Sequence, residues 1–253
     1  MQNNVGTTYY EMHDVARALP YHREAVRLAP GYAEAWANLG ADLQALGRDA
    51  EAVDAYRQAL EIKPEMAFVH SNLGVVLRAL WRAGEAATEL RTAMKLEPAT
   101  AADHAGLADA LVQSGRTQDA IAEYQKAVEM NPLSAPTRAA LGYVLLQSGR
   151  FLEADAQLRQ ALSLEPANAA AHDNLGNLLQ QSGRLDEALA EYQAALRAAG
   201  ASELPDIHND FGVALAKLGR VDDAIPHFRE ALRLKPGFEK AEGNLTRALS
   251  VRR

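Results

Sequence analysis

Apolar and small residues recur along this chain at intervals of 34 residues or of twice 34. The pair Leu-Gly marks the interval most clearly, at Leu39-Gly40, Leu73-Gly74, Leu141-Gly142 and Leu175-Gly176. With Ala33 as position 1 of a repeat, positions 4, 7, 8 and 11 fall on one face of a first helix. Positions 20, 24, 27 and 28 fall on one face of a second helix. The pattern therefore predicts a stack of helix–turn–helix repeats.

The positions predicted to be buried hold similar residues in successive repeats. Positions 20 and 27 are always alanine, as at Ala52 and Ala59. A larger side chain at such a close approach of helices would cost about 1–3 kcal/mol. Position 8 is glycine in most repeats, and position 24 usually holds a large side chain, as at Gly40 and Tyr56.

The turn between the two helices has its own residue pattern. A glycine there can take the left-handed conformation that ends a helix. An arginine follows at position 16, where its charge suits the negative end of the first helix. The turn glycines are Gly47, Gly115, Gly149, Gly183 and Gly219.

Repeat 33–66 carries the most complete set of these residues. They are Trp36, Leu39, Gly40, Ala52, Tyr56, Ala59 and Pro64. This pattern resembles the tetratricopeptide repeat, a 34-residue helix–turn–helix unit, and the resemblance extends over all 253 residues. It implies an all-α, right-handed α-solenoid of seven repeats followed by a C-terminal capping helix.

We expect a single solenoid domain, because each repeat of a solenoid contacts only its neighbours. The predicted repeats are 1–32, 33–66, 67–100, 101–134, 135–168, 169–204 and 205–238, and the capping helix is 239–253. Two departures interrupt the pattern. Trp81 stands where other repeats have the turn glycine, which predicts an extended helix or a reshaped turn with an aromatic ring covering the turn or exposed for binding. Residues 199–205 replace the usual Pro ending and lengthen their repeat by two residues.

The charge balance limits the class of partner. The chain has 26 Lys and Arg against 33 Asp and Glu, a formal charge of −7, and the excess is largest in residues 101–204. Nucleic acids and anionic membrane surfaces both favour basic proteins, so neither is expected as a partner. No apolar run is long enough to insert into a membrane, and the N-terminus lacks a signal-peptide core. We therefore expect a cytoplasmic protein that binds a protein or peptide.

Histidines are the most suggestive candidates for chemistry. His70, His104, His172 and His208 all stand at position 4. Neighbouring helices pack about 8–10 Å apart, whereas zinc needs ligand nitrogens about 2.0–2.1 Å from one ion. These histidines are therefore expected to be structural, with no metal or cofactor site. No serine-hydrolase elbow, phosphate-binding loop or HExxH helix occurs, so we expect no enzyme activity.

In the tetratricopeptide family the first helices line a concave groove, and position 6 faces it. Asparagine or aspartate recurs there, which resembles the asparagine ladder of O-linked N-acetylglucosamine transferase, where amides bind an extended peptide backbone. An amide has both donors and an acceptor, which match a peptide bond. Gly106 and Ala140 interrupt the ladder. The sequence Asn-Leu-Gly is also common in first helices of this family, which explains the asparagines about as well as ligand binding does. The predicted ladder residues are Asn38, Asn72, Asn174, Asp210 and Asn244.

An apolar stretch lies around the interruption, with Phe68, Val75, Tyr143 and Leu146 at groove positions. These side chains are predicted to anchor apolar groups of the ligand. The family also includes members that clamp a terminal carboxylate with cations. Here only Arg138, Lys217, Lys240 and Arg247 lie on or near first-helix faces, scattered over several repeats, so no such clamp is expected.

The predicted function is a non-catalytic protein-interaction scaffold that binds an extended peptide or a partner helix in its concave groove. Two alternatives remain. In the first alternative, the chain is a substrate-recruiting segment of a larger enzyme, such as a glycosyltransferase. Otherwise it is an assembly unit that self-associates through its first helix, which carries Val5, Tyr9, Tyr10 and Met12 with no helix before it.

Overall fold

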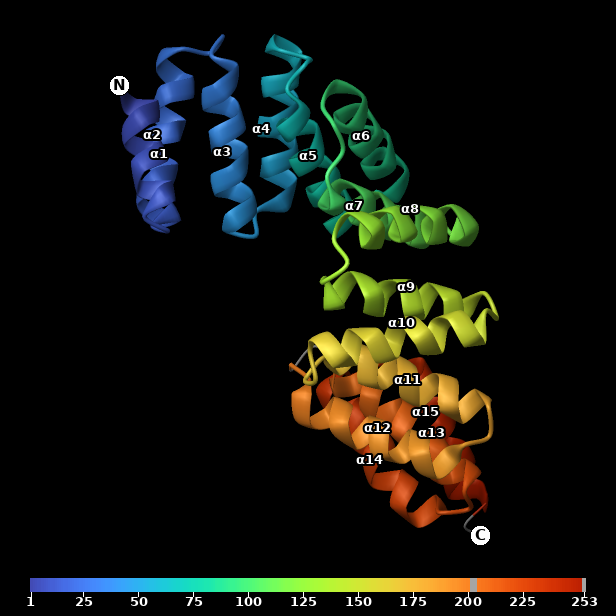
Figure 1. The fold of residues 1–253 in the computed structure, drawn as a ribbon. Coiled ribbons are helices and arrows are strands. Elements are labelled where there is room, and N and C mark those ends of the chain that lie inside the picture. Colours follow the sequence, from blue (N-terminus) through green and yellow to red (C-terminus); the bar gives the residue numbers. More distant parts are fainter. Residues whose placement is uncertain (201–203, 252–253) are drawn as a thin grey trace. The chain divides into compact units, whose positions relative to one another are not determined.

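The computed structural model describes residues 1–200 and 204–251, and the ordered elements in these ranges are all α-helices (Figure 1). The all-α fold class is therefore confirmed. The chain divides into two compact units, residues 1–130 and 131–253, which we call the N-terminal unit and the C-terminal unit and describe separately.

The N-terminal unit consists of four helix pairs, drawn in blue to green in Figure 1. Each first helix packs on its own second helix, and each second helix packs on the first helix of the next pair. The helices are α1 (Gln2–Glu11), α2 (Val15–Leu28), α3 (Ala33–Ala45), α4 (Asp49–Ile62), α5 (Ala67–Ala79), α6 (Ala83–Leu96), α7 (Ala101–Gln113) and α8 (Thr117–Met130).

The C-terminal unit contains three helix pairs and a last helix that packs on α13 and α14. The helices are α9 (Ala135–Gln147), α10 (Phe151–Leu164), α11 (Ala169–Gln181), α12 (Leu185–Ala198), α13 (Leu204–Lys217), α14 (Val221–Leu234) and α15 (Glu239–Val251). The two-residue lengthening predicted around 199–205 falls partly outside the described residues.

In the repeats that have glycine at position 8, this glycine lies against the side chain at position 24 of the same repeat. A Cβ added to Gly40 would lie 2.6 Å from the ring of Tyr56, and one added to Gly176 would lie 2.7 Å from the ring of Tyr192. Ala52 and Ala59, at positions 20 and 27, are fully buried. The alanines at the same positions of the other repeats are also fully or almost fully buried. The predicted interior is confirmed, and its small residues are required because the two helices approach so closely.

The turn between helices has the same backbone geometry in glycine and non-glycine repeats. Gly47 has a φ of 69° and Trp81 a φ of 59°, and each donates its backbone N–H to the carbonyl three residues before it. The predicted extension of the helix at Trp81 is therefore wrong, since α5 already ends at Ala79. The Trp81 side chain is 80% exposed, so its ring does not cover the turn.

The arginine at position 16 forms one backbone hydrogen bond and a separate side-chain ion pair. The backbone N–H of Arg48 donates to the carbonyl of Leu43 at 2.8 Å and so closes the first helix. Its guanidinium instead binds Glu51, in the first turn of the second helix, through two bonds of 2.6–2.7 Å. Its side-chain partner is thus a carboxylate rather than the end of the first helix. Such exposed pairs contribute about 0–1 kcal/mol.

None of the described helices is both long and apolar enough to cross a membrane.

Candidate functional site

Residues of the predicted ladder at position 6 bind a neighbouring repeat, line a pocket, or do both. Asn38 belongs to the first group. Its Nδ2 donates to Oδ1 of Asn3 at 3.0 Å and to Oγ1 of Thr7 at 3.3 Å. Both acceptors lie on α1, in the preceding repeat. The Asn38 amide therefore links two repeats of the N-terminal unit.

The C-terminal unit repeats this arrangement at its far end. Asn244 Nδ2 on α15 donates to Asn209 Oδ1 on α13 at 2.9 Å. Asp210 accepts from Asn177 at 3.1 Å and from Asn209 at 3.0 Å. Burial raises the pKa of Asp210, while the two amide donors oppose that rise. Asp210 and Asn244 thus belong to a polar network that joins the last two repeats and helix α15, in which Tyr192 also donates to Asn177.

Asn72 lies beside a small pocket in the N-terminal unit. Its side chain is hydrogen-bonded to Tyr56. The pocket has a volume of about 220 Å³ and lies between α5, the end of α6 and α7. Phe68, 52% exposed, lines it together with Ser71 and Asn72.

The charged groups of this pocket are acidic. Glu97 and Asp103 both line it, and Ser71 donates to Asp103 at 2.7 Å. Partial burial opposes ionisation of Asp103, but hydrogen bonds from Ser71 and Thr100 outweigh it and lower the pKa of this carboxyl. The pocket therefore presents a stabilised negative charge.

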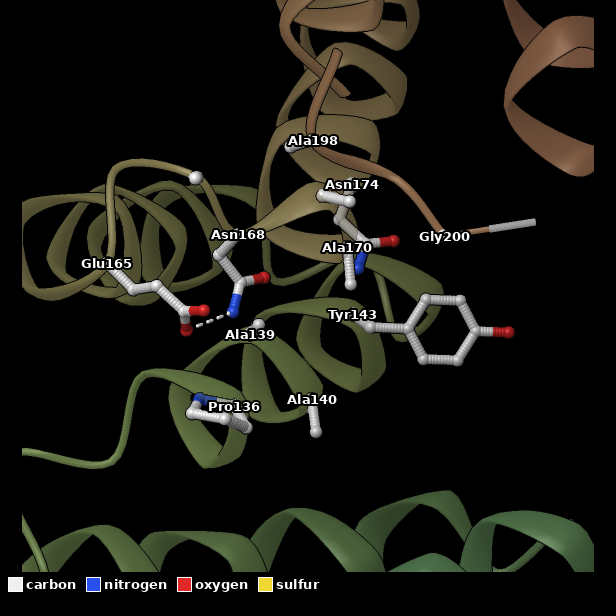
Figure 2. Close-up of a pocket in the computed structure, with 12 residues that line it drawn as sticks. Pro136, Ala139, Ala140, Tyr143, Glu165, Asn168, Ala170, Asn174, Ala198 and Gly200 are labelled. Atoms are coloured by element: carbon white, nitrogen blue, oxygen red, sulfur yellow. Dashed lines mark hydrogen bonds between the residues drawn. The ribbon is translucent and has the colours of Figure 1, made fainter. Parts of the chain in front are cut away.

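Asn174 lies beside a larger pocket in the C-terminal unit, with a volume of about 500 Å³ (Figure 2). The Asn174 amide projects from α11 into this hollow, and the Tyr143 ring stands at its side. No described residue forms a hydrogen bond with the Asn174 side chain. Among the described residues of the lining, Glu165 is the charged one, and one of its oxygens accepts from Asn168 Nδ2 at 2.8 Å.

The four predicted apolar anchors do not behave alike. Phe68, Val75 and Tyr143 are exposed, at 52%, 38% and 41%. Leu146 is only 3% exposed, so the prediction that it anchors a ligand is wrong. Its side chain packs inside the C-terminal unit, because an apolar residue at position 12 can turn towards the neighbouring helices. The structure thus brings Phe68 to Asn72 and Tyr143 to Asn174, each pair in one pocket.

A third pocket lies in the C-terminal unit between α13, α14 and α15, with a volume of about 280 Å³ and a largely apolar lining. Lys217 and Arg247 both line it, beside Asn244. These cations are far apart in sequence, at position 13 of the last repeat and at position 9 of the C-terminal helix α15. Comparing positions across consecutive first helices, rather than within one, would have found this pair.

The position-4 histidines bind the second helix of their own repeat. Nδ1 of His70, His104 and His172 lies 2.6 Å from a carboxylate oxygen of Glu89, Glu123 and Glu191, respectively. The exception is in the last repeat, where Nδ1 of His208 lies 2.9 Å from Nδ1 of His227. Within the described residues, no group of three or more metal-ligating side chains comes together.

Solved structures share this fold at low sequence identity. A chain of the APC/C hetero-tetramer Cut9–Hcn1 aligns with a TM-score of 0.80 and 19% identity, over 96% of this chain and 48% of that one. This chain thus spans about half the length of that protein. A tetratricopeptide repeat protein from Parabacteroides merdae aligns with a TM-score of 0.78 and 16% identity, over 98% and 97%.

A third structure, YrrB, is described as a tetratricopeptide repeat protein with an unusual peptide-binding site. It aligns with a TM-score of 0.55 and 19% identity, over 88% of this chain and 96% of that one. At these identities the likenesses establish the fold alone. Among curated protein sequences, none matches this chain.

Family models of the tetratricopeptide repeat match residues 1–65, 108–149, 139–203 and 174–237. Together these matches extend over most of the chain and include helices of both units. The same helices carry the glycine-to-ring contacts and buried alanines described above. On sequence and fold together, the chain belongs to the tetratricopeptide repeat family.

Proposed function

We propose that this chain is a non-catalytic protein-interaction scaffold that binds an extended peptide or a partner helix along its first helices. The observation that carries the proposal is the pairing of an exposed aromatic side chain with an amide in one hollow, at Tyr143 and Asn174. An aromatic side chain supplies apolar contact area, and an amide can bind a peptide backbone whatever its side chains.

The N-terminal unit supports the same proposal with a second pair, Phe68 and Asn72. Because each unit has its own pocket between successive first helices, each can contact a ligand segment without the other. Asn38, Asp210 and Asn244 hold repeats together in this proposal, since each side chain already forms a hydrogen bond with a preceding repeat.

The test compares two double variants of the C-terminal unit by affinity capture from cell lysate. Tyr143→Ala/Asn174→Ala removes the aromatic and the amide from the pocket. Phe151→Ala/Gln193→Ala removes an exposed aromatic and an exposed amide from the second helices α10 and α12. Partners retained by the wild type and the second variant but lost by the first would support the proposal. Equal retention by both variants would contradict it.

Self-association is a second candidate function, because α1 exposes apolar side chains. Met12 and Tyr10 are 63% and 39% exposed, whereas Tyr9 stacks on Tyr21 with ring centroids 5.4 Å apart. In this alternative, two copies bury these side chains against each other. Light scattering would then show a concentration-dependent mass that Tyr10→Ser/Met12→Ser abolishes. A constant monomer mass would exclude it.

A further inference from the structure

We infer that the pocket beside Asn174 selects an aromatic side chain of a peptide whose neighbouring residue is lysine or arginine. The inference rests on the proposed function and adds the chemistry of the ligand. It is carried by the size of the pocket, by its polar group and by the sign of its charge.

The size of the pocket follows from short side chains. Alanine or glycine supplies most of the wall, including Ala139, Ala140 and Ala170. Position 2 of the first helix is Pro136 here but Phe68 in the N-terminal pocket, which is less than half as large. A volume of about 500 Å³ lies within the range of about 300–1,000 Å³ of ordinary ligand pockets, whereas about 220 Å³ lies below it. Such a hollow accommodates a large ring and part of the backbone beside it.

The polar group of the pocket fits the backbone of such a ligand. The Asn174 amide points into the hollow and has no hydrogen-bonding partner among the described residues (Figure 2). Its donor and acceptor can satisfy one peptide group, which would otherwise lose its water on entering the pocket. The Tyr143 ring then lies beside the entering side chain, as aromatic pairs favour.

The charge of the pocket selects the neighbouring residue. Glu165 is the charged side chain among the described residues of the lining, and it accepts a hydrogen bond from the neutral amide of Asn168. A lysine or arginine of the peptide can therefore bind the Glu165 carboxylate, which no cation among the described lining residues neutralises. Glu97 lines the N-terminal pocket and stands at position 31 of its repeat, as Glu165 does. Both pockets therefore have a carboxylate at the residue that follows the second helix. An acidic peptide would meet like charge at either one.

The experiment is a selection of displayed random nine-residue peptides on the full chain. We expect the enriched peptides to share an aromatic residue next to lysine or arginine. A synthetic peptide with the enriched sequence then serves as the probe for titrations by fluorescence anisotropy. Enrichment without an aromatic-basic pair would overturn the inference while leaving peptide binding intact. Failure to enrich any peptide would overturn the proposed peptide-binding function as well.

Variants then place the ligand in the pocket. Ala170→Phe fills the hollow from an exposed position, and Phe68 shows that position 2 accepts this side chain. It should weaken binding at least about tenfold, the loss expected when an apolar anchor is excluded. The matched control Ala156→Phe, at an exposed position of α10, should leave binding unchanged. Circular dichroism checks that both variants fold; equal affinities would overturn the inference.

The charge is tested by reversal. Glu165→Gln should weaken binding of the basic peptide about two- to fivefold, as expected from the loss of an exposed ion pair. Glu165→Lys should shift the selected neighbour from lysine or arginine to aspartate or glutamate. An unchanged preference in the Glu165→Lys selection would overturn the assignment of charge to this residue.

Discussion

The interior of the repeats and the surface of their first helices follow different rules. In the interior, a position has the same role wherever it occurs: Gly40 lies against Tyr56 just as Gly176 lies against Tyr192. On the first-helix surface, position 6 holds asparagine at both Asn38 and Asn174. The first donates to the preceding repeat, and the second faces a pocket.

The difference comes from the residues that each side chain meets. An interior contact joins two helices of one repeat, so its partner is fixed within the repeat. A position-6 side chain meets positions 5 and 9 of the preceding repeat. Asn38 finds acceptors there, Asn3 and Thr7, whereas Asn174 finds Ala139 and Tyr143. A repeat position therefore predicts packing well and polar function poorly.

The largest effect is expected in the interior. Gly176→Ala places a Cβ 2.7 Å from the Tyr192 ring, and such overpacking should lower the free energy of unfolding by about 1–3 kcal/mol. Gly243→Ala on α15 makes the same substitution where no atom beyond the nearby backbone of the helix itself lies within 4 Å of the added Cβ. It should be stabilising, by about 0.5–1 kcal/mol, because alanine favours the helix. Urea unfolding measures both, and equal shifts would remove the close-contact explanation.

The next effect concerns the amide that joins repeats. Asn38→Ala should lower the free energy of unfolding by about 1 kcal/mol, because it removes partly buried hydrogen bonds to Asn3 and Thr7. Asn3→Ala breaks the shorter of these bonds from the other side. The double variant should therefore lose less than the sum of the two single losses, measured as a double-mutant cycle by urea unfolding. Strict additivity would show that the bond contributes nothing.

A pH-dependent effect is expected where the last repeat departs from the others. Burial lowers the pKa of both His208 and His227, and His208, whose Nδ1 lies 2.9 Å from Nδ1 of His227, further lowers the pKa of His227. Glu230 and Arg233 act on His208 with opposite signs, and Asp223 partly stabilises a charge on His227. The folded state thus binds fewer protons than the unfolded state, so stability is full above about pH 6.5 and falls as the pH drops below it.

His227→Glu tests this by recreating the histidine–carboxylate pair of the other repeats. Unfolding by urea at pH 7.5 and pH 5.5 should show a smaller acid loss in this variant than in the wild type. His13→Gln, which changes an exposed histidine in a turn, is the control and should keep the wild-type loss. An acid loss of the same size in all three proteins would place the sensitivity elsewhere.

The smallest effect on stability is expected at Asn174. Its side chain forms no hydrogen bond with a described residue, so Asn174→Ala should change the free energy of unfolding by no more than about 0.5 kcal/mol. The same variant should weaken binding of a selected peptide, because the amide is proposed to contact its backbone. A loss of stability as large as that of Asn38→Ala would show that Asn174 also holds repeats together.

Much of the fold could be predicted because it depends on residues close in sequence. The helical period identifies the two faces of each repeat, and invariant alanine and glycine mark where helices meet. The turn at Trp81 was mispredicted because the surrounding helices hold its backbone at a positive φ that tryptophan alone would disfavour. Of the residues predicted separately as ladder and anchor, Phe68 and Asn72 line one pocket and Tyr143 and Asn174 line another. Leu146, predicted as an anchor, is buried.

The sequence by itself determined the repeat, the all-helical fold, the family and the close-packed interior, since each follows from a pattern confined to 34 residues. Only the tertiary structure decided which amides are hydrogen-bonded and which apolar side chains are buried. It also brought His208 to His227, and Lys217 and Arg247 into the lining of one pocket. The physical reason is that a hydrogen bond or a pocket depends on which atoms of separate helices come within a few ångströms. Similar residues at one repeat position meet different neighbours as the chain proceeds.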